Sequence, residues 1–176
     1  VLTHSLKWLE SRRRAEEMEF VGFYLEGYTK DINFPVIESW AFGAPAHSPF
    51  VVAWQREFHR ALIEEGTQSY LNTLYANQEQ VVSLQGIADP VYLLIHVTAQ
   101  QVLRRPNSFR LALFKAEETA YFYQKSLAWK WYWLYARLCL IKDSTSPAPI
   151  IKLRGGERRH FAELFAKSDV EKGSVW

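Results

Sequence analysis

The stretch that decides the fold runs from Glu19 to Glu65 and reads EFVGFYLEGYTKDINFPVIESWAFGAPAHSPFVVAWQREFHRALIEE. Its apolar run at residues 20–25 predicts a buried strand, and residues 36–42 predict a second strand. A helix is expected from Pro49 to about Glu65, because apolar side chains recur there at helical spacing. Ser48 is placed to cap this helix, and Pro49 occupies its first position, where a missing N–H costs nothing. Such an order of strands, small-residue turn and capped helix can present side chains at the rim of a pocket.

A polar pair, Glu38-Ser39, interrupts the second apolar run. A buried carboxylate is costly in free energy unless it is paired or has a function. Glu38 is therefore expected to be either paired or functional.

The rest of the chain is predicted to be mostly helical. We expect helices at residues 6–18, 67–76, 91–103, 126–142 and 157–167, and short strands at 109–114 and 150–153. Residues 77–88 are ambiguous and fit a loop with a short apolar anchor. The predicted fold class is α+β, mostly helical with a small sheet, in one partial domain that covers residues 1–176.

The predicted helix at 91–103 is apolar over most of its circumference, which is typical of a buried helix. His96 and Gln100 lie four residues apart and so share one face. They are candidate substrate-binding residues that can converge on a polar ligand. The alternative is a buried histidine that is satisfied by Gln100 or by a backbone group.

The composition limits the classes of partner. Hydrophobic residues make up 48% and charged residues 23% of the 176, which is typical of a folded protein. A net charge of +2 without a long basic stripe argues against a nucleic-acid partner. The cluster at residues 12–14, Arg-Arg-Arg, fits a solvated helix face better than a phosphate site. A single cysteine, Cys139, excludes an internal disulfide.

Aromatic residues make up 15% of the chain. They can offer faces to sugar rings or simply fill the core. The segment 126–142 has three tryptophans. About 15 residues of it reach only ~22 Å as a helix, short of the ~30 Å hydrocarbon layer of a bilayer. It can lie in a membrane interface, which would give peripheral membrane association, or pack against the rest of the protein.

A glycine pair at residues 155–156 separates the last predicted strand from the last helix. Together with Arg154 and Arg158 it makes a candidate site for donor phosphate. The sequence has no Walker loop, GxGxxG, HExxH or GxSxG motif, and it has no Asp-x-Asp pair.

The motif FVGFYLEGYT…PVIESWAFGAPAHSPFVVAWQREF resembles the capsular polysaccharide synthesis family of glycosyltransferases. This family belongs to the Asp-x-Asp sugar transferases, which include fungal Golgi mannosyltransferases. The segments DPVYLLIHVTAQQVL, AEETAYFYQ and IIKLRGGERR are similar to the same family, so the resemblance spans most of residues 1–160.

The resemblance implies the C-terminal part of a GT-A-like fold. Glu38 is then a base or an acceptor of hydrogen bonds from sugar hydroxyls, and Ser39 and Trp40 contact the sugar. A divalent metal, Mn or Mg, is implied by the family and not by this chain. The tail residues Glu171, Ser174 and Trp176 are similar in spacing to the end of the catalytic domain in clostridial glucosylating toxins, which implies metal ligation by Ser174 and donor packing by Trp176.

The sequence thus predicts part of a hexosyltransferase that uses a nucleotide-sugar donor and a glycan acceptor. Without Asp-x-Asp the chain alone is expected to bind the donor poorly, as a fragment would. The alternatives are a non-catalytic glycan-binding module and a membrane-interface module left by truncation. The expected location is the cytoplasm, with possible membrane association, or the Golgi lumen if the source is a fungus.

Overall fold

The chain divides into two compact units in this computed structural model, which describes residues 1–15, 17–141, 146–165 and 174–175. Unit 1 joins residues 1–6 to residues 116–176, and unit 2 consists of residues 7–115. The fold class is mixed α+β, largely helical with one two-stranded parallel sheet, as the sequence predicts.

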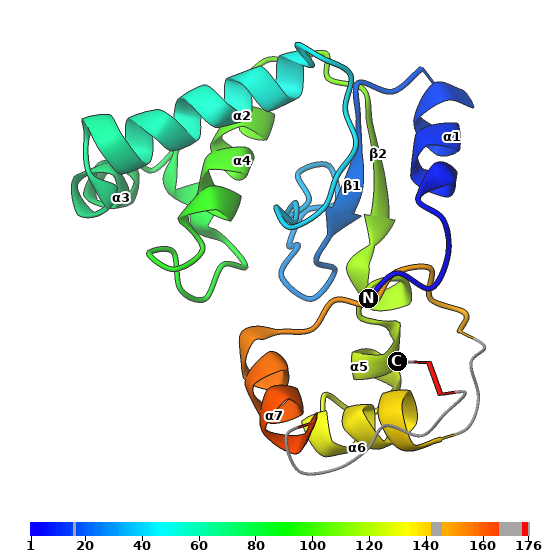
Figure 1. Cartoon of the computed structure of the whole chain (residues 1–176). Coiled ribbons are helices and arrows are strands. Elements are labelled where there is room, and N and C mark those ends of the chain that lie inside the picture. Colours follow the sequence, from blue (N-terminus) through cyan, green and yellow to red (C-terminus); the bar gives the residue numbers. More distant parts are fainter. Residues whose placement is uncertain (16, 142–145, 166–173, 176) are drawn as a thin grey trace. The chain divides into compact units, whose positions relative to one another are not determined.

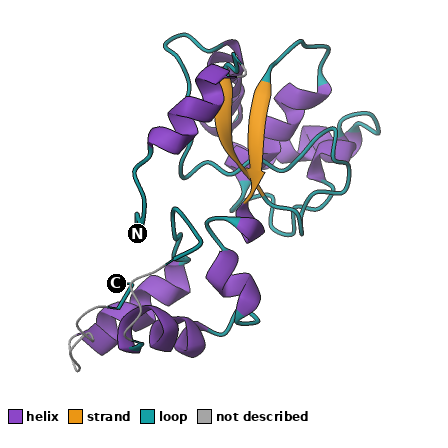
Figure 2. Cartoon of the chain, turned by 90° about the vertical axis from the view of Figure 1, so that its right-hand side faces the viewer, coloured by secondary structure: helices purple, strands orange, loops and turns teal. Residues whose placement is uncertain are grey.

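The sheet lies in unit 2 and consists of β1 (Phe20–Tyr24) and β2 (Leu111–Lys115). The two strands run parallel, with Phe20 opposite Leu111 at one end and Tyr24 opposite Lys115 at the other (Figure 2). Both strands were predicted from apolar runs, and both are confirmed. All five residues of β1 are buried, as expected for a strand that is covered on both faces.

The strand expected at residues 36–42 is not formed, so this prediction is wrong. Only single antiparallel bridges join the segment to β1, one from Ile37 to Tyr24 and one from Gly43 to Val21. Between them the chain bends, because two aromatic side chains of this segment dock onto β1. Trp40 stacks on Phe23 with ring centroids 4.9 Å apart, and Phe42 stacks on Phe20 with centroids 5.1 Å apart.

The helices of unit 2 begin and end near their predicted limits. They are α1 (Lys7–Ala15), α2 (Pro49–His59) with its π-helical continuation (Arg60–Glu64), α3 (Thr67–Ala76), a 3₁₀ turn (Val81–Leu84) and α4 (Leu94–Arg104). Ser48 caps α2, since its side chain accepts a hydrogen bond from the backbone N–H of Val51. Gly66 has a φ of 78°, which lets the chain turn between α2 and α3.

Helices cover both faces of the sheet in unit 2. On one face lie α2 and α4 (Figure 1). Phe50 and Trp54 of α2 are buried there against Phe20. On the other face lies α1, whose Trp8 packs edge-on against Phe23 and Phe114 at centroid distances of 6.2 and 4.9 Å. Residues 20 and 23 point to opposite faces because side chains alternate along a strand.

Unit 1 is built from short helices. They are the 3₁₀ turn Ala116–Glu118, α5 (Phe122–Ser126), α6 (Trp131–Tyr135) with its π-helical continuation (Ala136–Leu140), and α7 (Gly155–Phe165). Their core includes Tyr123, Leu138 and Phe161. The strand expected at residues 150–153 is reduced to one bridge between Ile150 and Leu2. None of the helices in the described ranges is long and apolar enough to cross a membrane.

The single helix expected over residues 126–142 is wrong. The chain leaves α5 and re-enters α6 through Ala128 and Trp129, which have φ angles of 50° and 61°. This left-handed turn places the Trp129 indole between Tyr121, at a centroid distance of 5.7 Å, and the Arg154 guanidinium, 4.8 Å from the indole centroid. Packing of one aromatic side chain therefore overrides the local helical preference.

Candidate functional site

Glu38 and His96 form a buried contact in unit 2. The Oε2 atom of Glu38 lies 3.2 Å from Nε2 of His96, and each side chain is only 8% exposed. The two residues are 58 positions apart in the sequence and come from the segment beside β1 and from α4. A buried carboxylate and imidazole in contact can share or exchange a proton, which is a common element of catalytic sites.

Backbone contacts hold both members of this pair in place. The N–H of Glu38 donates to the carbonyl of Phe23, over 2.8 Å, so the carboxylate is anchored to the edge of β1. His96 lies on the buried side of α4, where nine of eleven residues are buried. Its second ring nitrogen, Nδ1, is buried and has no hydrogen-bond partner in the part of the chain that the structure describes. With the ring proton on Nε2, Nδ1 carries a lone pair that is not engaged.

A cavity of about 270 Å³ lies in unit 2, and neither Glu38 nor His96 is among the residues that line it. Ser39 and Ile95, the chain neighbours of Glu38 and His96, both line it. The rest of the lining is mainly aromatic or apolar and comprises Phe42, Val51, Trp54, Gln55 and Phe58. The volume falls near the lower end of the ~300–1,000 Å³ that is typical of small-molecule pockets. The cavity therefore suits one small ring with an apolar face.

Trp40 is half-buried, and its indole stacks on Phe23 with an angle of 17° between the ring planes. One face of the indole is thus used within the fold. Stacking on a sugar, as predicted for Trp40, would have to use the opposite face.

Gln100 does not converge with His96 on a common ligand. Its side-chain amide donates instead to the carbonyl oxygens of Phe34 and Pro35, over 2.9 and 2.6 Å. The partner of His96 is Glu38, so Gln100 does not satisfy the histidine either. These hydrogen bonds connect the loop before Val36 to α4.

The residues predicted to bind donor phosphate lie in unit 1. The carboxylate of Glu157 occupies the turn that was expected to hold phosphate: it accepts from the backbone N–H of Arg154 over 2.7 Å and from Nε of Arg154 over 2.6 Å. Arg158 donates to the carbonyl of Leu153, over 3.4 Å. The protein thus supplies its own anion at this helix N-terminus, which does not favour a phosphate there.

Two predicted residues lie in the C-terminal tail. Trp176 is outside the described residues, and Ser174 is buried. Within the described ranges, no group of three or more His, Cys, Asp or Glu side chains could hold a metal ion. The divalent metal that the resemblance implies stays a prediction.

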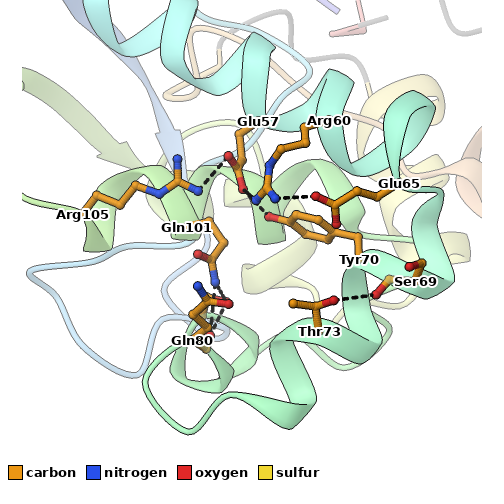
Figure 3. A network of polar contacts seen from close by, with 10 residues as sticks. Glu57, Arg60, Glu65, Ser69, Tyr70, Thr73, Gln80, Gln101 and Arg105 are labelled. Atoms are coloured by element: carbon orange, nitrogen blue, oxygen red, sulfur yellow. Dashed lines mark hydrogen bonds and ion pairs between the residues drawn. The ribbon is translucent and has the colours of Figure 1, made fainter.

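Sequence reasoning missed a second buried carboxylate, Glu57 of α2, which is 4% exposed (Figure 3). It accepts hydrogen bonds from Tyr70 and Arg60, each over 2.6 Å, and pairs with Arg105 over 2.7 Å. Burial alone would raise the pKa of Glu57, but these hydrogen bonds outweigh it and lower the pKa. The i,i+3 spacing of Glu57 and Arg60 could have indicated an ion pair from the sequence. The contacts of Glu57 with Tyr70 and Arg105 are tertiary and could not be predicted from local spacing.

Comparisons with protein-family models, with curated proteins and with solved structures found no match to this chain.

Proposed function

We propose that this chain forms the acceptor side of a GT-A-like glycosyltransferase, which transfers a hexose from a nucleotide-sugar to a glycan acceptor in capsular or extracellular polysaccharide synthesis. The observation that carries the proposal is the buried contact between Glu38 and His96, whose chain neighbours Ser39 and Ile95 line an aromatic cavity. The resemblance of the residues around Glu38, Ser39 and Trp40 to such enzymes supports the same assignment.

In this reaction the acceptor hydroxyl attacks the anomeric carbon, and the bond to the nucleotide diphosphate breaks with its electron pair. The hydroxyl proton must go to a base. In the proposed mechanism Nδ1 of His96 takes that proton, since it is the ring nitrogen without a partner among the described residues. The carboxylate of Glu38 accepts from Nε2–H, fixes the tautomer and stabilises the imidazolium that forms.

The proposal assigns no residue of this chain to the donor diphosphate or to a metal. Glycosyltransferases of the Asp-x-Asp group bind both through that motif, which these 176 residues lack. Ser39 is proposed to contact the sugar from the wall of the cavity. Trp40, which the resemblance also assigns to sugar contact, stacks on Phe23 and does not line this cavity.

Transfer assays on the intact protein test this proposal. UDP-glucose, UDP-galactose and GDP-mannose would be offered with neutral and acidic oligosaccharide acceptors, and product would be measured by mass spectrometry. Glu38→Gln and His96→Gln should each lower kcat by about 10²–10⁴-fold, the usual contribution of a general base. Glu57→Gln, which removes a buried carboxylate outside the site, should leave kcat of the folded protein unchanged.

Two outcomes count against the enzymatic assignment. One is a full-length protein, assayed together with any donor-binding part, that neither transfers nor hydrolyses any of the three donors. The other is a Glu38→Gln variant that folds and retains full kcat. Glycan binding that persists in both proteins without turnover would instead favour a non-catalytic glycan-binding module.

A second candidate function, peripheral membrane binding, is favoured by a specific surface of unit 1. Trp129, in the turn before α6, and Tyr132 and Trp133 of α6 are 39%, 48% and 57% exposed. Leu140, the last residue of the π-helical continuation, and Ile141 after it are 49% and 47% exposed. Exposed tryptophan and tyrosine next to aliphatic side chains are typical of segments that lie in a membrane interface.

Liposome sedimentation tests this second function. Wild-type protein should sediment with vesicles of phosphatidylcholine and phosphatidylglycerol, and a Trp133→Ser, Tyr132→Ser double variant should do so less. A matched variant, Tyr92→Ser, removes a side chain that is 83% exposed in unit 2 and should have no effect. Wild-type protein that stays in the supernatant would exclude membrane binding.

A further inference from the structure

A groove of about 640 Å³ runs along unit 2 between the loop before Val36, the end of α4 and the start of β2. Its walls include the rings of Phe34 and Phe109 and two arginines, Arg104 and Arg105. The charge of Arg105 is already neutralised, because its guanidinium pairs with Glu57 over 2.7 Å. Arg104 has no ion-pair partner among the described residues.

The guanidinium of Arg104 is held in one orientation by its neighbours. It lies over the ring of Phe34, 4.5 Å from the ring centroid, and its Nε donates to Oε1 of Gln100 over 3.3 Å. Gln100 is 1% exposed and is itself fixed by two hydrogen bonds to the backbone before Val36. The two Nη groups of Arg104 make no hydrogen bond to described residues, so this fork of donors is pre-organised and unused.

The surroundings of Arg104 favour an added anion. Burial lowers the pKa of Arg104, and the opposing effect of nearby Asp31 is weaker. Asp31 is near enough to act on Arg104 electrostatically but makes no ion pair with it among the described residues. The Oδ1 atom of Asp31 accepts from the backbone and side-chain nitrogens of Asn33 over 2.9 and 3.1 Å. A guanidinium remains protonated at neutral pH, so a half-buried positive charge faces the groove without a counter-ion.

The groove and the candidate site both involve α4, but no residue lines both cavities. His96, Gln100 and Arg104 recur every four residues and lie along one side of this helix. Arg104 is eight residues beyond His96, which corresponds to about 12 Å along the helix axis. A ligand that reached both would be extended, as an oligosaccharide is.

We propose that this groove binds the anionic group of an acidic sugar, a hexuronate carboxylate or a sugar phosphate, through the two Nη groups of Arg104. Phe109 and Pro106 supply apolar surface for the ring that carries the anion. The assignment of the ligand as a glycan rests on the proposed function, and it narrows the acceptor to an acidic glycan.

Calorimetric titration of the intact protein tests the inference with three probes: a tetrasaccharide of galacturonate, glucose 1-phosphate and a neutral maltotetraose. At least one anionic probe should bind about tenfold or more tightly than the neutral one, and its affinity should fall as salt is raised. A comparison of the two anionic probes identifies carboxylate or phosphate as the preferred group. Arg104→Gln should weaken anion binding by about tenfold or more.

Control variants distinguish binding at Arg104 from nonspecific attraction to surface charge and from an effect on catalysis. Arg56→Gln removes an exposed arginine that lines a neighbouring groove and should leave binding unchanged. Arg104→Lys keeps the positive charge but loses the paired guanidinium donors, so an intermediate affinity is expected. This variant replaces Arg104→Gln in the test if the glutamine variant does not fold. Glu38→Gln should bind the anionic probe normally, which distinguishes failure of the catalytic proposal from failure of this one. Equal affinity for all three probes, or unchanged affinity in both Arg104 variants, would overturn the inference.

Discussion

The phenolic hydroxyl of Tyr70 on α3 donates a hydrogen bond to Oε1 of Glu57 on α2, over 2.6 Å. Arg60 shares the same oxygen and also lies over the Tyr70 ring, 5.1 Å from its centroid (Figure 3). One buried carboxylate thus joins two successive helices, and the arginines on either side keep it ionised. Glu57 should therefore be a structural residue whose protonation weakens the fold.

The pH dependence of stability tests this role. The pKa of Glu57 is lowered in the folded protein, so the folded state binds the proton less tightly than the unfolded state does. Its stabilising contribution is therefore present above the unfolded pKa of about 4.3 and is lost as pH falls through the lower folded pKa. In urea unfolding, Glu57→Gln should destabilise by about 1–3 kcal/mol at pH 7 and by much less at pH 3. A difference that is the same at both pH values would contradict this assignment.

Gly86 should tolerate no side chain. Its φ is 84°, and a Cβ added there would lie 1.6 Å from the carbonyl oxygen of Tyr28, a backbone atom that cannot move aside. Gly66 has a similar φ of 78° but open space around it. Gly66→Ala should cost about 1–3 kcal/mol from backbone strain alone. Gly86→Ala should cost about 1–3 kcal/mol more, through overpacking, in thermal or urea unfolding. Equal losses in the two variants would rule out the steric explanation.

Cys139 should be unreactive in the folded protein. It is fully buried, and burial raises the pKa of its thiol to about 12. At pH 8 only about one thiol in 10⁴ is then ionised, against roughly a quarter at the unfolded pKa of about 8.5. Iodoacetamide should alkylate the native protein far more slowly than the urea-unfolded protein, as followed by mass spectrometry. Because this is the only cysteine of the chain, Cys139→Ser gives the background reaction, and equal native and unfolded rates would disprove burial of the thiol.

Gln100 should act as a positioning residue for Arg104. Gln100→Leu leaves two buried carbonyls without a donor, which should destabilise the protein by about 1–3 kcal/mol, and it also frees the Arg104 side chain. Anionic-sugar binding should weaken severalfold. Gln101→Leu is the matched control, because Gln101 is a buried neighbour that donates to Ser83 and to Gln80 instead (Figure 3). It should lose similar stability without a change in binding, and identical binding losses in both variants would refute the role of Gln100.

Local patterns predicted the helices of unit 2 well. The capped helix that starts at Pro49 and the helix over residues 67–76 were both readable, because caps, glycine and 3.6-residue periodicity act within a few residues. The segment at 36–42 was wrongly predicted as a strand. Its apolar residues include Trp40 and Phe42, whose rings pack on β1. The prediction of one helix over residues 126–142 was also wrong, because the chain makes a left-handed turn at Trp129.

The residues of the candidate site could be predicted from the sequence, but their contacts could not. The sequence singled out Glu38 as a carboxylate in an apolar run and His96 as a polar residue on a buried helix, but it could not join them across 58 residues. Nor did it indicate that Gln100 would bind the backbone and so fix Arg104 in a groove.

The sequence by itself determined most of the helical segments, the cap of the main helix, and the burial of Glu38 and His96. These properties depend on hydrophobic periodicity and on hydrogen bonds between residues close in the chain. Only the tertiary structure decided the partner of each buried polar group: His96 for Glu38, Tyr70 and two arginines for Glu57, and Glu157 for the glycine turn. The physical reason is that a buried charge requires some partner, while which one it meets depends on how distant segments pack.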